Sequence, residues 1–361
     1  MPKKRQERKK TTKIPYARGF KIPSDSDKLK AIKRTKLEDI ELTFQPNQEL
    51  FKELPPPNTK YDWLAVYAER GQTCSEYIKT NPWLSRKPVR GLSSKAFSPK
   101  GSTICEKYPE AKAYIIPVGK LDFGDIDTIK ELVRYASIFY NIPIKVLDPF
   151  EVVVDVKKGQ TFWQSTDGEL IMIKSRFHKK TKRFQFLIDS CLKEISSRIP
   201  DDALFVIALT MEELYADKRD LFVSGMASGA SRSAIFSLKR YDPTLKFCTE
   251  FWHKYEENAC RVDERWNLLL KRSCTLLVHE MGHLLGIGHC IYFDCCMNGS
   301  GHLEEDIRQS MHLCPVDLRK LKILCGIDVK ERYRKLQEFF KEFKFHTEEN
   351  WITKRLEQLS Q

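Results

Sequence analysis

Three histidines and one glutamate between residues 279 and 289 have the types and spacing of a metal site that activates water. His279 and His283 are four residues apart, so on a helix they share one face and can offer ring nitrogens to one metal ion. Glu280 lies one step round the helix, where its carboxylate can reach a water on that metal. With His289, three neutral imidazoles leave zinc a fourth position open for water, as in catalytic and not in structural sites.

The third histidine requires the chain to turn. His289 cannot lie on the same straight helix as His283, because six residues are far from a whole number of turns. Gly286 is the residue type that permits the left-handed conformation found at helix ends. Incidental histidines on an apolar helix are the alternative, but three histidines, an acid and a glycine in this register are rare by chance. An apolar lead-in without proline predicts a buried helix before the motif; it comprises Trp266, Leu268, Leu269, Leu270, Leu276, Leu277 and Val278.

The residues that follow the motif carry a resemblance to a known family. Cys290 directly follows the third histidine, Cys295 and Met297 come next, and a later segment reads Cys314-Pro315-Val316-Asp317. The extended zinc motif with a following methionine is typical of metzincins. With the added cysteines, the segment closely resembles the archaemetzincin family. The resemblance covers about residues 113–326 and is also carried by the segments 117–119, 222–227, 237–241 and 299–305.

The resemblance implies a zinc metallopeptidase with a metzincin-like α/β (α+β) fold, which combines a mixed twisted sheet, an active-site helix and a zinc-clipped C-terminal part. It implies that His279, His283 and His289 bind a catalytic Zn²⁺. Glu280 would be the general base, and Met297 would be the Met-turn residue beneath the zinc. The substrate would be a peptide or protein, cleaved from its amino terminus or internally. It would lie antiparallel to an edge strand near residues 222–225 or 234–238.

The resemblance also implies a second, structural Zn²⁺. Three of its ligands would be Cys290, Cys295 and Cys314. The family's fourth ligand is a cysteine, whereas this sequence has Asp317. A carboxylate binds zinc at about 2.0–2.2 Å and carries a thiolate's charge, so we expect Asp317 to be the fourth ligand. There are two alternatives: Cys296 or Cys325 could be the fourth ligand in place of Asp317, or the site could have lost its metal and the thiols would simply be buried.

The elements that position these residues are expected to alternate between strands and helices, which predicts a mixed α/β sheet. We expect strands at 114–118, 142–147, 204–209, 221–223 and 234–238, helices at 126–140 and 184–199, and one or two helices over 329–359. A surface hairpin should turn at Asp167-Gly168. The expected organisation is a basic disordered tail over 1–45, an N-terminal extension over 46–110, a catalytic domain over 111–327 and a helical extension over 328–361.

Composition limits the class of protein and its partners. The chain has 361 residues, 41% of them hydrophobic, which excludes a wholly disordered chain. No apolar run approaches the roughly 20 residues of a membrane helix, and the basic start lacks the apolar core of a secretory signal. We therefore expect no membrane contact and an intracellular location, in the cytoplasm or also the nucleus. Eleven cysteines, an odd number, suit thiols that bind metal or lie inert in the core.

Two other classes of function stay open. One is a zinc-bound scaffold that does not cleave. The other is a binder of nucleic acid or another polyanion, because residues 1–13 and 157–183 supply nearly all of the net charge of +13. The polyanion interpretation is disfavoured because the sequence has no zinc finger or aromatic-basic platform of recognised spacing.

Overall fold

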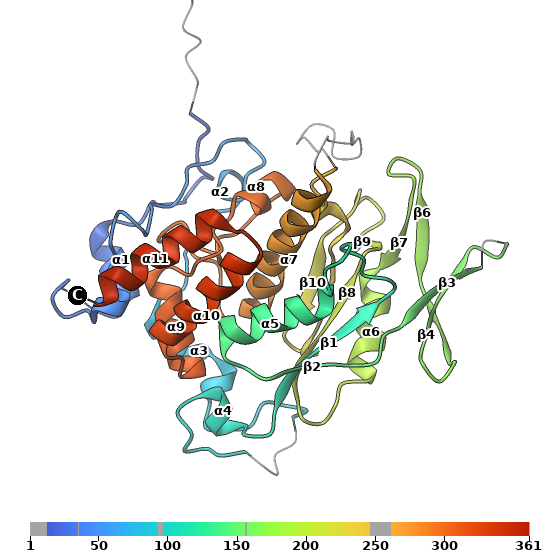
Figure 1. The fold of residues 1–361 in the computed structure, drawn as a ribbon, viewed down its shortest axis with the longest axis horizontal. Coiled ribbons are helices and arrows are strands. Elements are labelled where there is room, and N and C mark those ends of the chain that lie inside the picture. Colours follow the sequence, from blue (N-terminus) through green and yellow to red (C-terminus); the bar gives the residue numbers. More distant parts are fainter. Residues whose placement is uncertain (1–12, 35, 93–96, 156, 246–260, 361) are drawn as a thin grey trace, which may run out of the picture.

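A five-stranded mixed sheet forms the centre of the computed structural model, which describes residues 13–34, 36–92, 97–155, 157–245 and 261–360 (Figure 1). Its strands are β1 (Lys112–Val118), β2 (Ile144–Val146), β8 (Ala203–Thr210), β10 (Gly225–Ser228) and β11 (Ser233–Ser237). Their order is β10-β11-β8-β1-β2. Only β10 runs antiparallel to its neighbour, so the predicted mixed sheet is confirmed and β10 forms one free edge.

Helices cover both faces of this sheet. On one face lie α5 (Thr128–Tyr140) and the long α7 (Val262–Leu284), and on the other lies α6 (Ile188–Ser197) (Figure 1). Side chains alternate between the two layers: Ile207 belongs to the core beneath α7, and Val206 to the core beneath α6. Because both faces are covered, β8 is buried along its whole length, which explains its continuous apolar run.

Two smaller sheets extend from the central one. The first joins β3 (Glu151–Asp155), β4 (Gln160–Gln164) and β5 (Leu170–Ile173); the second joins β6 (Ser175–His178), β7 (Arg183–Leu187) and β9 (Glu213–Tyr215). The β4–β5 hairpin turns at Asp167-Gly168 as predicted, with Gly168 at φ +88°. The basic segment 157–183 therefore lies on these strands and their turns, away from α7 (Figure 1).

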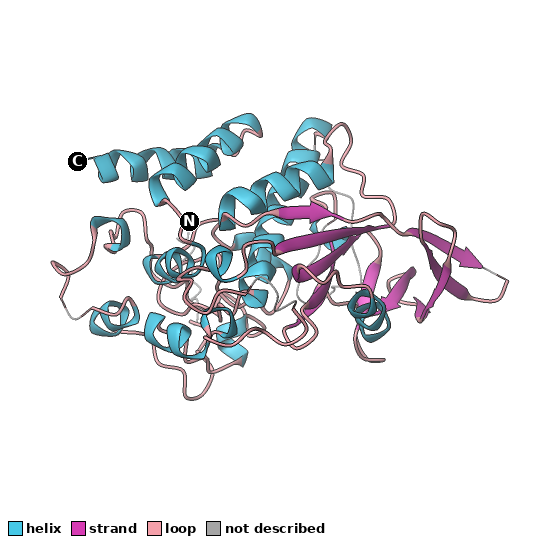
Figure 2. Ribbon diagram, turned by 90° about the horizontal axis from the view of Figure 1, so that it is seen from below, coloured by secondary structure: helices cyan, strands magenta, loops and turns pink. Residues whose placement is uncertain are grey.

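Helices gather at one end of the molecule and strands at the other, as Figure 2 shows. Before the sheet come α1 (Asp25–Ala31), α2 (Trp63–Val66), α3 (Cys74–Thr80) and α4 (Ile104–Lys107), with 3₁₀ turns η1 (Leu42–Phe44) and η2 (Pro82–Leu84). After it come η3 (Lys239–Tyr241), α8 (Leu303–Arg308), α9 (Pro315–Cys325), α10 (Val329–Glu342) and α11 (His346–Ser360). The two terminal helices confirm the prediction for 329–359. None of the helices in the described ranges combines the length and apolarity needed to cross a bilayer.

Two predicted elements were wrong. The helix expected over 184–199 begins only at Ile188, because residues 183–187 pair with β6 and β9 and form a strand instead. Residues 221–223 contribute a single bridge through Val223, and the edge strand begins at Gly225, between the strands expected at 221–223 and 234–238. The edge strand lies where it does because residues 225–228 pair with residues 233–236. The apolar Phe222 and Val223, which suggested a strand, line a cleft instead.

The N-terminal residues are more ordered than the sequence suggested. A capping box between Ser24 and Asp27 starts α1, and Ile32 and Phe44 are buried in the same apolar core as the C-terminal helices. The expected disordered tail therefore does not describe residues 24–34 and 36–45, while residues 1–12 lie outside the described ranges. One apolar cluster extends from Ala31 to Leu359, and the division of the chain at 46, 111 and 328 remains a proposal.

Candidate metal centres

The last turns of α7 carry the first two histidines of the motif. The Nε2 atoms of His279 and His283 are 3.0 Å apart. Each Nδ1 lies 2.8 Å from a backbone carbonyl oxygen, that of Cys296 for His279 and that of Ile287 for His283. The Nδ1–H groups can donate to these carbonyls, which fixes the rings and leaves both Nε2 lone pairs free for a metal.

A Schellman turn ends α7 and brings back the third histidine. Gly286 has φ +80°, its N–H donates to the carbonyl of His283, and the N–H of Ile287 donates to that of Gly282. The turn places the ring centroid of His289 at 4.8 Å from that of His283 and 5.7 Å from that of His279. The predicted left-handed glycine is confirmed, and the three imidazoles come together.

Side chains of the N-terminal segment bind the carbonyls that the helix end leaves without partners. The amide of Asn81 donates to the carbonyl of Leu285 at 2.7 Å, and the indole of Trp83 donates to that of Leu284 at 2.9 Å. Gln72 bonds to the backbone of the turn itself at 3.0 and 3.1 Å. The last carbonyls of a helix have no partner within it, so these contacts replace water there and fix the turn.

Glu69 is a contact of His289 that the sequence did not predict. Its Oε1 lies 2.7 Å from Nδ1 of His289 and accepts a second hydrogen bond from the indole of Trp63 at 2.6 Å. Burial raises the pKa of Glu69, but the hydrogen bond and charge of His289, followed by the bond from Trp63, outweigh burial and lower it overall. Because 220 residues separate the pair, no local pattern could have indicated it.

The three imidazoles have the spacing that zinc requires, and burial keeps two of them neutral. Tetrahedral zinc with nitrogens at about 2.0–2.1 Å requires them to be roughly 3.3 Å apart, close to the distance between His279 and His283. One nitrogen from each of the three histidines lies within 4.8 Å of the other two. Burial lowers the pKa of His279 well below its usual value and that of His283 to about 4. Both rings are therefore neutral donors at pH 7.

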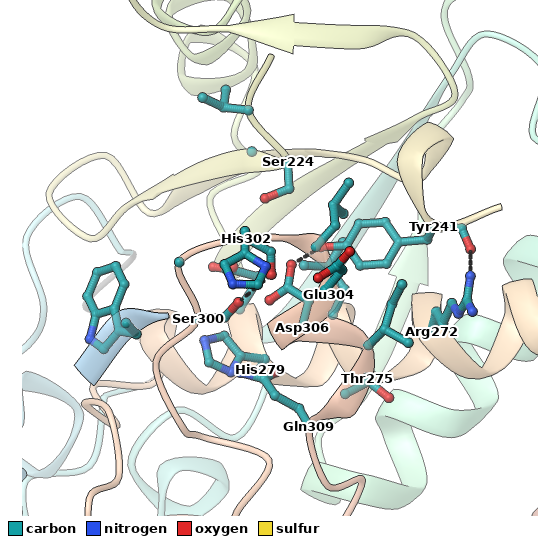
Figure 3. A pocket seen from close by; sticks show the side chains of 18 of the residues that line it. Ser224, Tyr241, Arg272, Thr275, His279, Ser300, His302, Glu304, Asp306 and Gln309 are labelled. Atoms are coloured by element: carbon teal, nitrogen blue, oxygen red, sulfur yellow. Dashed lines mark hydrogen bonds between the residues drawn. The ribbon is translucent and has the colours of Figure 1, made fainter. Parts of the chain in front are cut away.

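A cleft of about 440 Å³ opens in front of the histidines and is lined by Glu280. Burial, followed by the carboxylate of Asp306, raises the pKa of Glu280 to about 8. Figure 3 shows Ser224 and His279 facing the cleft from opposite sides, with Tyr241 and Asp306 between them. The hydroxyl of Tyr241 donates a hydrogen bond to the carboxylate of Asp306 at 2.8 Å, so its proton already has an acceptor within the protein.

The second predicted set of ligands also comes together, at a fully buried position. Sγ of Cys290 lies 3.5 Å from that of Cys314, and Oδ2 of Asp317 lies 3.2 Å from Sγ of Cys295 and 3.5 Å from Sγ of Cys314. Tetrahedral zinc with sulfurs at about 2.3 Å requires sulfurs roughly 3.8 Å apart, so the cluster fits zinc after a small expansion. Among the described residues, the cluster includes neither Cys296 nor Cys325.

Two buried residues support these sites. Lys320 is completely buried, and its Nζ donates to Oδ1 of Asp317 at 2.8 Å, opposite the oxygen that faces the thiols. Met297 is also fully buried and packs against α7 at Gly282, where an added Cβ would lie 2.7 Å from its sulfur. The structure therefore places Met297 below the helix turn that joins His279 to His283, while its role as Met-turn residue remains a proposal.

Comparison with known proteins shows which peptidases this chain is similar to. The sequence model of Peptidase family M54 matches residues 167–323. Archaemetzincin-2 of Mus musculus is 29% identical over 313 residues, which cover 81% of this chain and 76% of the mouse protein; the Homo sapiens protein is 29% identical over 309 residues, covering 81% and 75%. The crystal structure of archaemetzincin from Methanopyrus kandleri is 23% identical and covers 59% of this chain and 97% of its own, with a TM-score of 0.37. The chain is thus similar to archaemetzincin-2 over about four-fifths of its length, and its residues 167–323 match Peptidase family M54.

Proposed function

We propose that the chain hydrolyses peptide bonds at a zinc ion held by Nε2 of His279, His283 and His289, with Glu280 as the general base. The observation that carries this proposal is the convergence of three imidazoles at the wall of a cleft that also contains the Glu280 carboxylate. The similarity to archaemetzincins and the match to Peptidase family M54 support the same reaction class.

The chemistry divides between the metal and the carboxylate. A zinc ion, when bound, lowers the pKa of its water to about 7 and polarises a carbonyl oxygen. Glu280 accepts the proton of the attacking water and then donates it to the departing amine. Its pKa of about 8 without metal suits a group that must take up a proton, and a nearby dication lowers this pKa, so that Glu280 is ionised before the reaction begins.

The free edge of the central sheet is the proposed platform for the substrate. Of the two strands that the sequence suggested, β11 is paired on both sides, by β8 and β10, so only β10 can accept another strand. Residues 222–225, which lead into β10, line the cleft opposite His279 (Figure 3). An extended peptide that pairs antiparallel with this edge would pass its backbone across the three histidines.

We further propose that Cys290, Cys295, Cys314 and Asp317 hold a second, structural zinc ion. These four residues are buried, their ligand atoms lie close together, and none of the four lines the cleft in front of the histidines. These features support a closed, four-coordinate site. Free thiolate ligands persist in reducing compartments, and this is consistent with the proposed location in the cytoplasm or nucleus.

The variant Glu280→Gln tests the proposed mechanism, because it keeps the size of the side chain and removes the base. We expect cleavage of a peptide library to fall by about 10²–10⁴-fold, while the zinc content stays the same. Glu264→Gln, an exposed change on the same helix, is the matched control. Mass spectrometry of the products distinguishes trimming of amino termini from internal cleavage.

Two outcomes would contradict the proposal. Full activity in Glu280→Gln would exclude Glu280 as the base. A wild-type protein that holds zinc but cleaves no peptide of the library would instead favour the non-cleaving scaffold. The polyanion alternative would use the strands of segment 157–183, from which no described residue lines the cleft.

A further inference from the structure

We propose that Glu69 is a positioning residue of the histidine centre, which orients His289 and thereby makes the N-terminal segment 58–84 part of the metal site. This inference rests on the proposed function, because it takes His289 as a zinc ligand. It assigns a role to a segment that lies outside residues 167–323, where the family match is found.

The partners of the three imidazoles differ in origin and charge. His279 and His283 bond through Nδ1 to neutral backbone carbonyls only 17 and 4 residues away in the sequence. His289 bonds through Nδ1 to a carboxylate that is 220 residues away. A carboxylate on Nδ1 fixes the tautomer, makes Nε2 a stronger donor and places a negative charge near the dication. The third ligand therefore depends on a separate part of the chain.

The position of Glu69 is itself fixed. Trp63 donates its indole N–H to the Glu69 carboxylate, and its ring packs edge-on against His289 with centroids 5.0 Å apart. The backbone N–H of Trp63 in turn donates to Glu305 at 2.8 Å. The side chains of Glu69 and His289 are about four-fifths buried, with exposed fractions of 20% and 21%. A carboxylate held by a second donor has little freedom to swing away from the imidazole.

The same segment also fixes the turn on which His289 is carried. Asn81 and Trp83 bind the last carbonyls of α7, and Gln72 binds the backbone of the turn. Residues 58–84 thus hold the third histidine at two points, through the backbone that carries it and through the ring itself. The contacts to the backbone are a structural contribution. Only the hydrogen bond from the His289 ring to Glu69 acts directly on the donor strength of Nε2. A test must separate them.

The test measures zinc affinity of the full chain by competition with a chromophoric chelator. Glu69→Gln keeps an acceptor for His289 and Trp63 but removes the charge, whereas Glu69→Ala removes both. We expect the affinity of the histidine site to fall about 10-fold in Glu69→Gln and further, toward 100-fold, in Glu69→Ala. Glu76→Gln makes the same chemical change in the same segment and should leave the affinity unchanged, because the Glu76 carboxylate accepts its hydrogen bonds from Thr73 and not from a histidine of the site.

A further variant separates failure of this inference from failure of the proposed function. His283→Ala should abolish one of the zinc-binding phases and so identifies the phase that belongs to the imidazoles. If His283→Ala changes no phase, the proposed function is wrong. If it does, but Glu69→Gln and a folded Glu69→Ala both bind zinc as tightly as the wild type, the role of Glu69 is overturned. Should Glu69→Ala fail to fold, Glu69→Gln alone decides. Cobalt in place of zinc provides a second readout, because a weaker imidazole donor shifts its visible spectrum.

Discussion

Replacing Asp317 with alanine is expected to remove a metal ligand and the partner of a buried lysine at once. Lys320 bonds to one carboxylate oxygen, while the other faces Cys295 and Cys314, and neither Asp317 nor Lys320 has exposed side-chain surface. Breaking a buried ion pair from one side costs about 3–5 kcal/mol. The free energy of unfolding of Asp317→Ala should therefore fall by at least this amount, with loss of the second zinc ion added to it.

A double variant separates the two effects. Asp317→Ala combined with Lys320→Met removes both charges, and replacing a buried ion pair by apolar side chains is often neutral or stabilising. We expect it to recover most of the 3–5 kcal/mol without recovering the metal. Zinc content by mass spectrometry should be two ions per chain in the wild type and one in both variants. Urea denaturation gives the free energies, and Lys320→Met alone should keep two zinc ions.

The double variant also provides the result that would refute this reasoning. If it holds two zinc ions, Asp317 is not a ligand. If the wild type holds a single zinc ion and the double variant is as stable as the wild type, Asp317 serves only as the partner of Lys320, and the cysteines form no second site.

Three further substitutions test the surroundings of the cleft. Gly286→Ala should lower the free energy of unfolding by about 1–3 kcal/mol and weaken zinc binding, because φ is +80° and the new Cβ would lie 2.7 Å from Asn81; urea denaturation and zinc titration measure both. Gly225→Ala would collide with Phe236 and displace β10, so steady-state kinetics should show a higher KM at unchanged zinc content. Burial raises the pKa of Asp62, but hydrogen bonds lower it overall, from 3.8 to about 2, so its ionised form stabilises the fold by roughly 2 kcal/mol above pH 4. The difference in unfolding free energy from Asp62→Asn should therefore shrink as the pH falls below 4, and its pH-dependent part should be lost as the pH falls through about 2.

Elements with a strong local pattern were predicted well from the sequence. The buried strand β8 and the amphipathic α5 lie within two residues of their predicted bounds, because a continuous apolar run and a helical period report burial directly. Residues 183–187 were assigned to a helix instead, since their apolar side chains suit either structure and only pairing with β6 and β9 decides for a strand. The edge strand β10 has no apolar run, and its pairing partner determines where it lies.

The same distinction holds for the metal centres. The two candidate ligand sets could be found in the sequence because their members lie within 39 residues of one another and helix geometry relates His279 to His283. Glu69 and Trp63 were not, because they come from a segment that resembles the family only loosely and reach His289 through the tertiary fold. Lys320 was missed for another reason, because a lysine in an amphipathic helix normally faces water. Only the structure shows that Lys320 is completely buried beside Asp317, where its positive charge balances the carboxylate.

The two candidate centres are joined by the loop 289–298, and this arrangement explains why a second metal so close to the first would matter. Cys290 directly follows His289, its N–H donates to the carbonyl of Met297, and the carbonyl of Cys296 holds the Nδ1 of His279. Fixing this loop through its cysteines therefore fixes the backbone that carries one imidazole and the carbonyl that orients another. A structural zinc on Cys290 and Cys295 would limit the motion of the adjacent His289 and of the carbonyl that orients His279, whereas Glu69 constrains the ring of His289 directly. The third imidazole is thus held between two supports that are far apart in the sequence, which suits a ligand that must keep its position while substrate and water exchange beside it.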